Sequence, residues 1–203
     1  ARQATVLGRS NAARIPLLIQ SCLQEGGHHL EDLDAVAVSR GPGSYTVLRI
    51  GTAAAKGICF ARNIPLLSVS TQQSLALASA GDDDEPETAY CPMIDARRME
   101  VYCALYDRRG REITPPQALI LEEKTLQHYL PADIPLVFSG NGAHKARPLL
   151  KNRAATFPAV ICNAAHIAPL AQEAFARQAF ENVAYYAPLY LKPPNITKPK
   201  KLL

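Results

Sequence analysis

The sequence predicts an α/β protein with two lobes, and three observations lead to this prediction. Between residues 11 and 80, apolar strand-like runs alternate with helix-like segments, which is typical of a parallel sheet with crossover helices. Residues 81–86, GDDDEP, then interrupt this alternation with an acidic loop. From residue 90 onwards, strand-like runs follow one another across short turns, as in an antiparallel meander. We therefore expect an N-terminal lobe at residues 1–85 and a C-terminal lobe at residues 86–203, whose last segment packs back on the N-terminal lobe.

The first predicted element is an amphipathic helix at residues 11–25. Its apolar side chains recur at helical spacing, Ser10 or Asn11 stands where a cap is needed, and Gly26-Gly27 follows its last turn. We expect another element of the lobe, or a partner, to cover such an apolar stripe.

The rest of the N-terminal lobe alternates strands and helices. The second helix is rich in glycine and alanine, so we expect another backbone to approach it closely, either inside the lobe or in a partner. The third helix is expected to have Thr71 as its cap. The predicted elements are a strand at 34–39, a glycine loop at 40–44, a helix at 45–61, a strand at 64–70 and a helix at 72–80.

The C-terminal lobe is predicted to begin as a meander and to continue with mixed elements. Polar turns at residues 95–100 and 107–110 separate its first strands, and the glycine that ends the second turn is typical of such a connection. The predicted elements are strands at 90–94, 101–106, 117–121 and 135–139, and helices at 122–129, 144–151 and 164–180.

The composition is that of an ordinary globular protein. Of the 203 residues, 48% are hydrophobic and 20% are charged, which excludes a mostly disordered chain. All apolar runs are too short for a transmembrane helix, so we expect no contact with a membrane. The five cysteines form no CxxC pair and are odd in number, which argues against a zinc site or a disulfide framework and for a reducing, cytoplasmic compartment. The net charge of +4 includes a basic tail at residues 192–201, which we interpret as a solvated end.

The most distinctive local feature is a glycine loop between a strand and a helix, within residues 39–57. Backbone N–H groups at such a helix start suit an anion, but the loop matches neither the GxGxxG nor the Walker pattern. The glycines equally allow a tight turn and close helix packing, so both interpretations stay open. Ser44 follows Gly43, and we interpret it as a helix cap rather than as a nucleophile.

Residues 41–51, GPGSYTVLRIG, resemble the signature of the TsaB (YeaZ) family. The likeness continues through AAKG at residues 54–57, DARRMEVY at 95–102 and YLK at 190–192, in the family's order and over most of the chain. The motif residues that carry it are Gly41, Pro42, Gly43, Ser44, Tyr45, Thr46, Arg49, Lys56, Gly57, Asp95, Arg97 and Glu100.

The resemblance implies the two-lobed, ribonuclease H-like fold of the actin, Hsp70 and sugar-kinase superfamily (ASKHA). It also implies a non-catalytic paralogue of the TsaD subunit, required for N6-threonylcarbamoyladenosine (t6A) modification of tRNA, with no cofactor or metal of its own. The implied partners are a TsaD-like catalytic subunit, which this chain activates, and a TsaE-like ATPase. Alone, the chain is expected to form a homodimer through the same surface, and its contact with tRNA is expected to be indirect.

The family pairs through helices of its N-terminal lobe, which correspond here to residues 11–25 and 44–61. Val47 stands where the family has glycine, and Asn11 stands where it has histidine. The family's first strand and hairpin, with the phosphate-loop aspartate, have no counterpart here, so we expect about twenty to thirty further residues before Ala1 and a bare sheet edge without them. The residues expected at the interface are Ile15, Leu18, Ile19, Cys22, Val47, Leu48, Gly51, Ala54 and Ala55.

Two other functions are alternatives. An ATP-dependent enzyme of the sugar-kinase superfamily would need the phosphate-loop aspartate, and residues 139–142, SGNG, are either that superfamily's nucleoside loop or a vestigial turn. A glycoprotease-like peptidase would need a nucleophile or a metal, yet the sequence contains no GxSxG, no HExxH and no histidine pair four residues apart. The adjacent His28 and His29 are interpreted as exposed loop residues.

A polar cluster lies on the turn between the first two strands of the C-terminal lobe. Its members are Asp95, Arg97 and Glu100. Either they face the cleft between the lobes, or they form an ordinary hairpin connection with local ion pairs. The sequence leaves both interpretations open.

Overall fold

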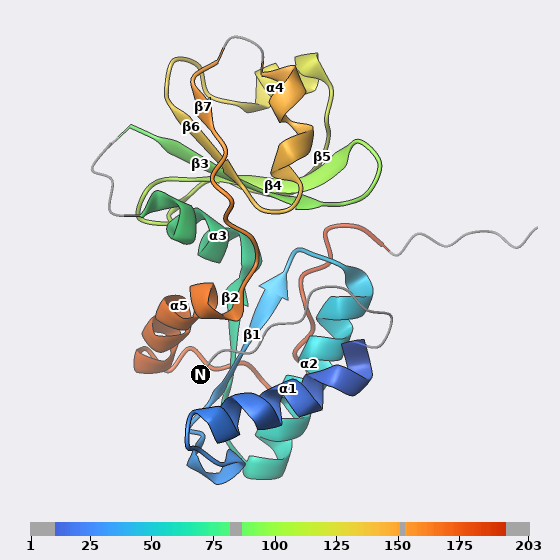
Figure 1. The fold of residues 1–203 in the computed structure, drawn as a ribbon, viewed down its shortest axis with the longest axis vertical. Coiled ribbons are helices and arrows are strands. Elements are labelled where there is room, and N and C mark those ends of the chain that lie inside the picture. Colours follow the sequence, from blue (N-terminus) through green and yellow to red (C-terminus); the bar gives the residue numbers. More distant parts are fainter. Residues whose placement is uncertain (1–10, 82–86, 151–152, 194–203) are drawn as a thin grey trace, which may run out of the picture.

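The computed structural model describes residues 11–81, 87–150 and 153–193. These residues form two sheets that lie one above the other, with a helix between them (Figure 1). We call the two-stranded sheet with its helices the N-terminal lobe, and the five-stranded sheet with its helix the C-terminal lobe. The boundary expected at residues 85 and 86, the cap expected at Ser10 and most of the basic tail lie outside the described residues.

The N-terminal lobe is built around two parallel strands. β1 (Val36–Gly41) pairs with β2 (Leu66–Ser70), with Val36 opposite Leu66. α2 (Tyr45–Arg62) connects the strands and packs on one side of the sheet, while α5 (Ala164–Ala176) packs on the other (Figure 1). α1 (Asn11–Glu25) lies along the outside of α2. The predicted order of helix, strand, helix and strand is therefore confirmed.

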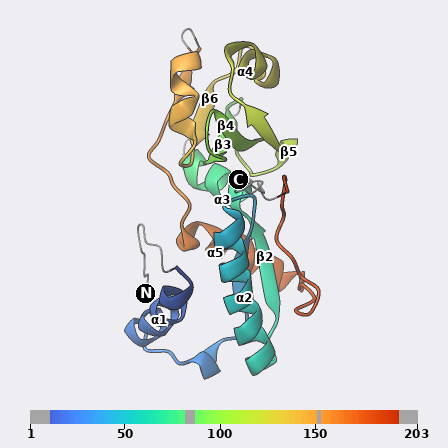
Figure 2. The ribbon, with the colours of Figure 1, turned by 90° about the vertical axis from the view of Figure 1, so that its right-hand side faces the viewer.

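α3 (Thr71–Ala80) follows β2 directly and lies between the two sheets (Figures 1 and 2). Its cap is Ser70, whose Oγ accepts a hydrogen bond from the Gln73 N–H at 3.3 Å. The prediction that Thr71 caps this helix is therefore wrong by one residue. Thr71 is the first helical residue, and its hydroxyl is hydrogen-bonded to that of Ser39 on β1. This bond ties the start of α3 to the parallel sheet.

The C-terminal lobe contains a mixed sheet in the order β5-β4-β3-β6-β7. β3 pairs antiparallel with β4, and β4 with β5, so the predicted meander is confirmed. On the other side of β3, the strands β6 and β7 continue the sheet in parallel. The elements are β3 (Ala89–Asp95), β4 (Glu100–Tyr106), β5 (Glu112–Ile120), α4 (Glu123–Tyr129), β6 (Leu136–Ser139) and β7 (Ala155–Thr156).

The largest apolar core lies in this lobe, between the sheet and α4. It includes the fully buried side chains of Met93 on β3, Leu126 on α4 and Phe138 on β6. Cys91 and Cys103 are also fully buried there, as expected for free cysteines in apolar runs. Burial of each large side chain contributes roughly 1.5–3 kcal/mol to the free energy of folding. This core therefore stabilises the sheet from which the turns at its edge extend.

Two predicted elements of the C-terminal lobe differ because of proline. The third meander strand, predicted from residue 117, begins already at Glu112 and contains Pro115 and Pro116. It tolerates them because β5 is at the edge of the sheet, where an N–H group need not be donated. The helix predicted at residues 144–151 is wrong, since two 3₁₀ turns, Ala143–Lys145 and Arg147–Leu149, replace it. Pro148 cannot donate the hydrogen bond that a continuous helix requires.

The remaining differences concern short or terminal pieces. The helix predicted at residues 164–180 ends at Ala176, and Gln178 has a φ of 54°, in the left-handed region that ends helices. The two-residue strand β7 and the 3₁₀ turn Leu30–Asp32 were not predicted. Such pieces are too short to show a hydrophobic period.

After α5, the chain crosses the outside of the N-terminal lobe and reaches the C-terminal lobe (Figure 2). We call residues 181–192 the C-terminal strap. The Glu181 N–H donates to the Leu66 carbonyl oxygen of β2 at 2.8 Å, and the Leu189 N–H donates to that of Arg40 at 2.8 Å. The strap thus lies beside β2 at one end and beside the glycine loop at the other.

Candidate functional site

The glycine loop after β1 brings the main chain close to the C-terminal strap. Gly41 has a φ of 97°, in the left-handed region that favours glycine. A Cβ atom at this position would lie 2.9 Å from the Leu189 carbonyl oxygen. Close packing therefore requires glycine at this position, which favours the tight-turn interpretation of the loop.

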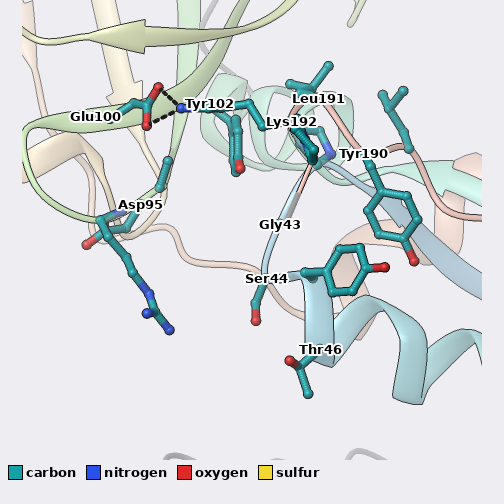
Figure 3. Close-up of a pocket in the computed structure, with 15 residues that line it drawn as sticks. Gly43, Ser44, Thr46, Asp95, Glu100, Tyr102, Tyr190, Leu191 and Lys192 are labelled. Atoms are coloured by element: carbon teal, nitrogen blue, oxygen red, sulfur yellow. Dashed lines mark hydrogen bonds and ion pairs between the residues drawn. The ribbon is translucent and has the colours of Figure 1, made fainter. Parts of the chain in front are cut away.

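The loop ends at Ser44, the residue just before α2. Ser44 therefore occupies the predicted cap position of α2, but its side chain does not make the hydrogen bond of a helix cap. The side chains of Ser44 and Thr46 are exposed and line a pocket between the lobes (Figure 3). The start of α2 therefore opens onto this pocket.

The inter-lobe pocket has a volume of about 310 Å³ (Figure 3). Its walls come from the glycine loop with the start of α2, from the turn between β3 and β4, and from the strap. All three residues of the predicted polar cluster line it. The lining residues are Pro42, Gly43, Ser44, Tyr45, Thr46, Asp95, Ala96, Arg97, Glu100, Tyr102, Leu189, Tyr190, Leu191, Lys192 and Pro193.

Asp95 is held at the pocket by a lysine of the C-terminal lobe. Lys145 Nζ lies 2.5 Å from Asp95 Oδ1 and also donates to the carbonyl oxygens of Arg98 (2.6 Å) and Glu100 (3.2 Å). The Lys145 side chain is 10% exposed. Burial raises the pKa of Asp95, but hydrogen bonds from Lys145 and from the Arg97 N–H outweigh it and hold that pKa below its usual value. Asp95 is therefore an anion that already has its partners at neutral pH.

Glu100 reaches across the edge of the pocket to the strap. Lys192 Nζ lies 2.7 and 2.9 Å from its two carboxylate oxygens (Figure 3). The cluster of Asp95, Arg97 and Glu100 thus faces the cleft, but its carboxylates pair with lysines 50 and 92 positions away. Neither lysine was predicted as a partner, because no local pattern in the sequence indicates contact across such separations.

The loop at residues 139–142 supports the same turn. Asn141 Oδ1 accepts a hydrogen bond from the Asp95 N–H at 3.0 Å, and the Gly142 N–H donates to the Met93 carbonyl oxygen at 2.9 Å. A Cβ atom at Gly142 would lie 2.9 Å from the Asp95 nitrogen. These contacts with the end of β3 favour a structural turn over a nucleoside loop.

Other residues of the glycine-loop motif attach the strap to α2. The rings of Tyr45 and Tyr190 lie 4.7 Å apart, and the Arg49 guanidinium lies 5.1 Å above the Tyr45 ring. Lys56 Nζ donates to two strap carbonyl oxygens, those of Ala184 (3.0 Å) and Tyr186 (3.2 Å). Much of the motif therefore positions the strap.

A second hollow, of about 540 Å³, lies between α1 and α2, and we call it the helix groove. Ile19 and Ala54, both expected at an interface, line it, and so does the motif residue Gly57. His28 and His29 are exposed at its rim, as predicted for loop residues. The lining residues are Pro16, Ile19, Gln20, Leu23, Gln24, His28, His29, Leu30, Glu31, Ala53, Ala54, Gly57 and Ile58.

The other residues expected at an interface differ in their exposure. Val47 is 46% exposed, whereas Leu48 and Ala55 are buried within the lobe at 8% and 5%. The latter two side chains therefore pack inside the lobe and support α2 from within. The half-buried members of the set are Ile15, Leu18, Cys22 and Gly51.

Two large exposed apolar side chains on these helices were not predicted. Leu17 on α1 is 65% exposed and Phe60 on α2 is 84% exposed. Helical spacing could have indicated them, because both lie outside the apolar stripe that faces the lobe. Both lie on the helices that form the helix groove, although neither lines it.

The residues that the structure describes lack two kinds of feature. In them, no three His, Cys, Asp or Glu side chains lie together as a metal site would require. None of their helices combines the length and the apolar character needed to cross a bilayer.

Comparisons with known proteins agree with this geometry. A family model described as "TsaD: tRNA N6-adenosine threonylcarbamoyltransferase" matches residues 5–196. The "tRNA threonylcarbamoyladenosine biosynthesis protein TsaB" of Bacillus subtilis is 28% identical over 155 residues, covering 75% of this chain and 66% of that protein. The protein of the same description from Escherichia coli is 37% identical over 100 residues, covering 49% and 42%. This chain thus spans less than two thirds of the length of either relative.

A solved structure has the same architecture. It is a Pseudomonas aeruginosa protein described as "an uncharacterized protein with similarity to peptidase YEAZ", with a TM-score of 0.76 and 27% identity over 93% of this chain and 87% of that one. Two lobes with a pocket between them and a glycine loop at its wall define a protein with an ASKHA-like α/β fold. The chain belongs to the TsaD family of that model, and its relatives and structural neighbour confirm the TsaB (YeaZ) resemblance within it.

Proposed function

We propose that this chain takes part in the formation of t6A in tRNA as the non-catalytic partner that activates a TsaD-like subunit. The names of its relatives support a role in t6A biosynthesis. The observation that carries the partner role is the helix groove, an apolar hollow between α1 and α2.

The helix groove has the character of a protein–protein interface. Large apolar patches are uncommon on surfaces that face only water, and the two helices that form the groove also expose Leu17 and Phe60. Ala53, Ala54 and Gly57 are small, so a partner helix can approach α2 closely. In this proposal a TsaD-like subunit fills the groove.

The inter-lobe pocket supports a non-catalytic role. Its two carboxylates are each paired with a lysine, Asp95 with Lys145 and Glu100 with Lys192. A general base needs a carboxylate within reach of a substrate proton, and these ion pairs occupy both groups.

The proposal has further parts that follow the family resemblance. The same groove pairs two copies of this chain when no partner is present, and a TsaE-like ATPase joins the assembly. Contact with tRNA is indirect, and the assembly works in the cytoplasm without a membrane.

Reconstitution of tRNA modification tests the proposal. Full-length versions of this chain are combined with its TsaD-like subunit, the other partners and tRNA, and t6A is measured by mass spectrometry. We expect Ala53→Glu, which places a charge in the groove, to lower partner affinity by about tenfold or more, as for a central interface residue. Ala168→Glu on α5 is the matched control, because both alanines are exposed helical residues.

The outcomes separate the two parts of the proposal. Equal t6A formation without this chain would show that it is not the required partner. Unchanged affinity of the Ala53→Glu variant, with a normal circular dichroism spectrum, would show that the partner binds elsewhere.

A further inference from the structure

The C-terminal strap forms one wall of the inter-lobe pocket and is attached to both lobes. We propose that the strap is a latch that gates this pocket, and that the ion pair between Lys192 and Glu100 is its release point. The gating goes beyond the proposed function and does not depend on it.

The attachment to the N-terminal lobe is extensive. Besides the backbone bonds of Glu181 and Leu189, Lys56 donates to two carbonyl oxygens in the middle of the strap. The side chains of Val183 and Tyr186 pack against the buried cluster formed by α2 and β2. The first half of the strap is therefore a fixed part of the N-terminal lobe.

The attachment to the C-terminal lobe is of another kind. The Glu100 side chain is 20% exposed and that of Lys192 is 39% exposed, so water reaches both groups. Such a pair shifts an equilibrium by a factor of only about two to five, and dissolved salt weakens it. Backbone bonds from Glu181 to Leu189 thus attach the strap to the N-terminal lobe, whereas the solvated ion pair of Lys192 ties the last described part of the strap across the cleft.

This asymmetry determines how the strap opens. When Lys192 leaves Glu100, residues 191–193 are free to move away from the β3–β4 turn, and the bond from the Leu189 N–H to Arg40 then lies next to the released end. Lys145 continues to hold that turn, since its bonds go to Asp95 and to backbone carbonyl oxygens and not to the strap. The pocket therefore opens at the strap side while its other walls stay in place.

The latch lies at one end of the helix that lines the helix groove. Tyr45, the first residue of α2, borders the inter-lobe pocket and contacts Tyr190 of the strap. Ala53 and Gly57, two turns and more further on, line the helix groove. A change in the strap therefore reaches α2 directly, although any effect on a TsaD-like partner rests on the proposed function.

Hydrogen exchange followed by mass spectrometry on the full chain, without partners, tests the latch. We expect Glu100→Gln to speed exchange of the Leu189 amide, and of its neighbours up to residue 192, by roughly twofold to fivefold, the contribution of an exposed ion pair. The amides of Tyr185 and Tyr186, which are bonded to Asn182, are expected to keep their rates. Raising the salt concentration is expected to reproduce the effect in the unmodified chain.

Three further variants make the test specific. Lys192→Met breaks the same ion pair without altering the sheet, and we expect the same pattern of exchange. The double variant Glu100→Lys with Lys192→Glu restores opposite charges and is expected to restore slow exchange. Glu173→Gln breaks another exposed ion pair, with Arg177 on α5, and is expected to leave the strap unchanged.

The contrary results are equally clear. Unchanged exchange at Leu189 in both Glu100→Gln and Lys192→Met would overturn the proposal. Equal acceleration along the whole strap would also overturn it, because the strap would then detach as a unit. If the double variant Glu100→Lys with Lys192→Glu did not restore slow hydrogen exchange at Leu189, the ion pair would be excluded as the release point.

Discussion

Lys145 provides a sharp test of how the turn at the inter-lobe pocket is held. Its ammonium group makes three hydrogen bonds, to Asp95 Oδ1 and to the carbonyl oxygens of Arg98 and Glu100. Lys145→Met keeps most of the side-chain volume but removes all three bonds. Asp95 is 34% exposed, so water replaces part of the loss at the carboxylate.

We expect the Lys145→Met variant to lose about 2–3 kcal/mol of unfolding free energy, since a bond to a charged group is worth about 1.5–3 kcal/mol and the rest is recovered from water. For a chain of this size, that corresponds to a fall in Tm of about 5–10 °C. Thermal unfolding followed by circular dichroism measures the change. Lys124→Met is the matched control, because Lys124 is an exposed helical lysine on α4 of the same lobe.

The same variant has a predicted pH dependence. The pKa of Asp95 is lower in the folded chain than in the unfolded chain, so this group stabilises the fold above its unfolded pKa. That stabilisation is lost as the pH falls through the folded pKa. Lys145→Met removes the main cause of the lowered pKa. The difference in unfolding free energy between the variant and the unmodified chain should therefore narrow as the pH falls below about 4. The reasoning would be refuted if this difference in unfolding free energy did not change with pH. It would also be refuted if Lys145→Met had the same Tm as Lys124→Met at neutral pH.

Two further predictions concern stability. Gly41→Ala should cost about 1–3 kcal/mol, because its φ of 97° is unfavourable for alanine and the new Cβ would meet the Leu189 carbonyl oxygen; urea unfolding measures this, and an unchanged midpoint would contradict the close approach. Gln72 is fully buried and its amide has no hydrogen-bond partner among the described residues, so Gln72→Met should raise the unfolding free energy by about 1 kcal/mol. A lower Tm for Gln72→Met would indicate that the amide is satisfied.

The elements with a clear local period could be predicted from the sequence. The spacing of apolar residues located α1, and the run of small residues after the glycine loop located α2, each within a residue of the observed ends. The predictions that failed depend on single residues that break a period. Pro148 divides the region predicted as one helix, and Ser70 caps α3 one residue before the expected Thr71.

The candidate site was predictable only where its residues are neighbours in the chain. The glycine loop and the turn with Asp95 and Glu100 are local motifs, and both line the inter-lobe pocket. The bonds that hold them come from Lys145 and Lys192, whose positions near these motifs depend on the folded topology. The exposure of individual side chains on α2 could likewise not be predicted from the sequence, because the burial of Leu48 depends on how α2 packs on β1.

The way in which the strap is attached affects how freely its sequence can vary. Several of its bonds to the N-terminal lobe use main-chain atoms, namely the N–H groups of Glu181 and Leu189 and the carbonyl oxygens of Ala184 and Tyr186. Replacing side chains leaves these atoms in place, so related proteins can follow the same course with different residues. Proline is the exception at residues 181 and 189, because it removes the N–H group that is needed there.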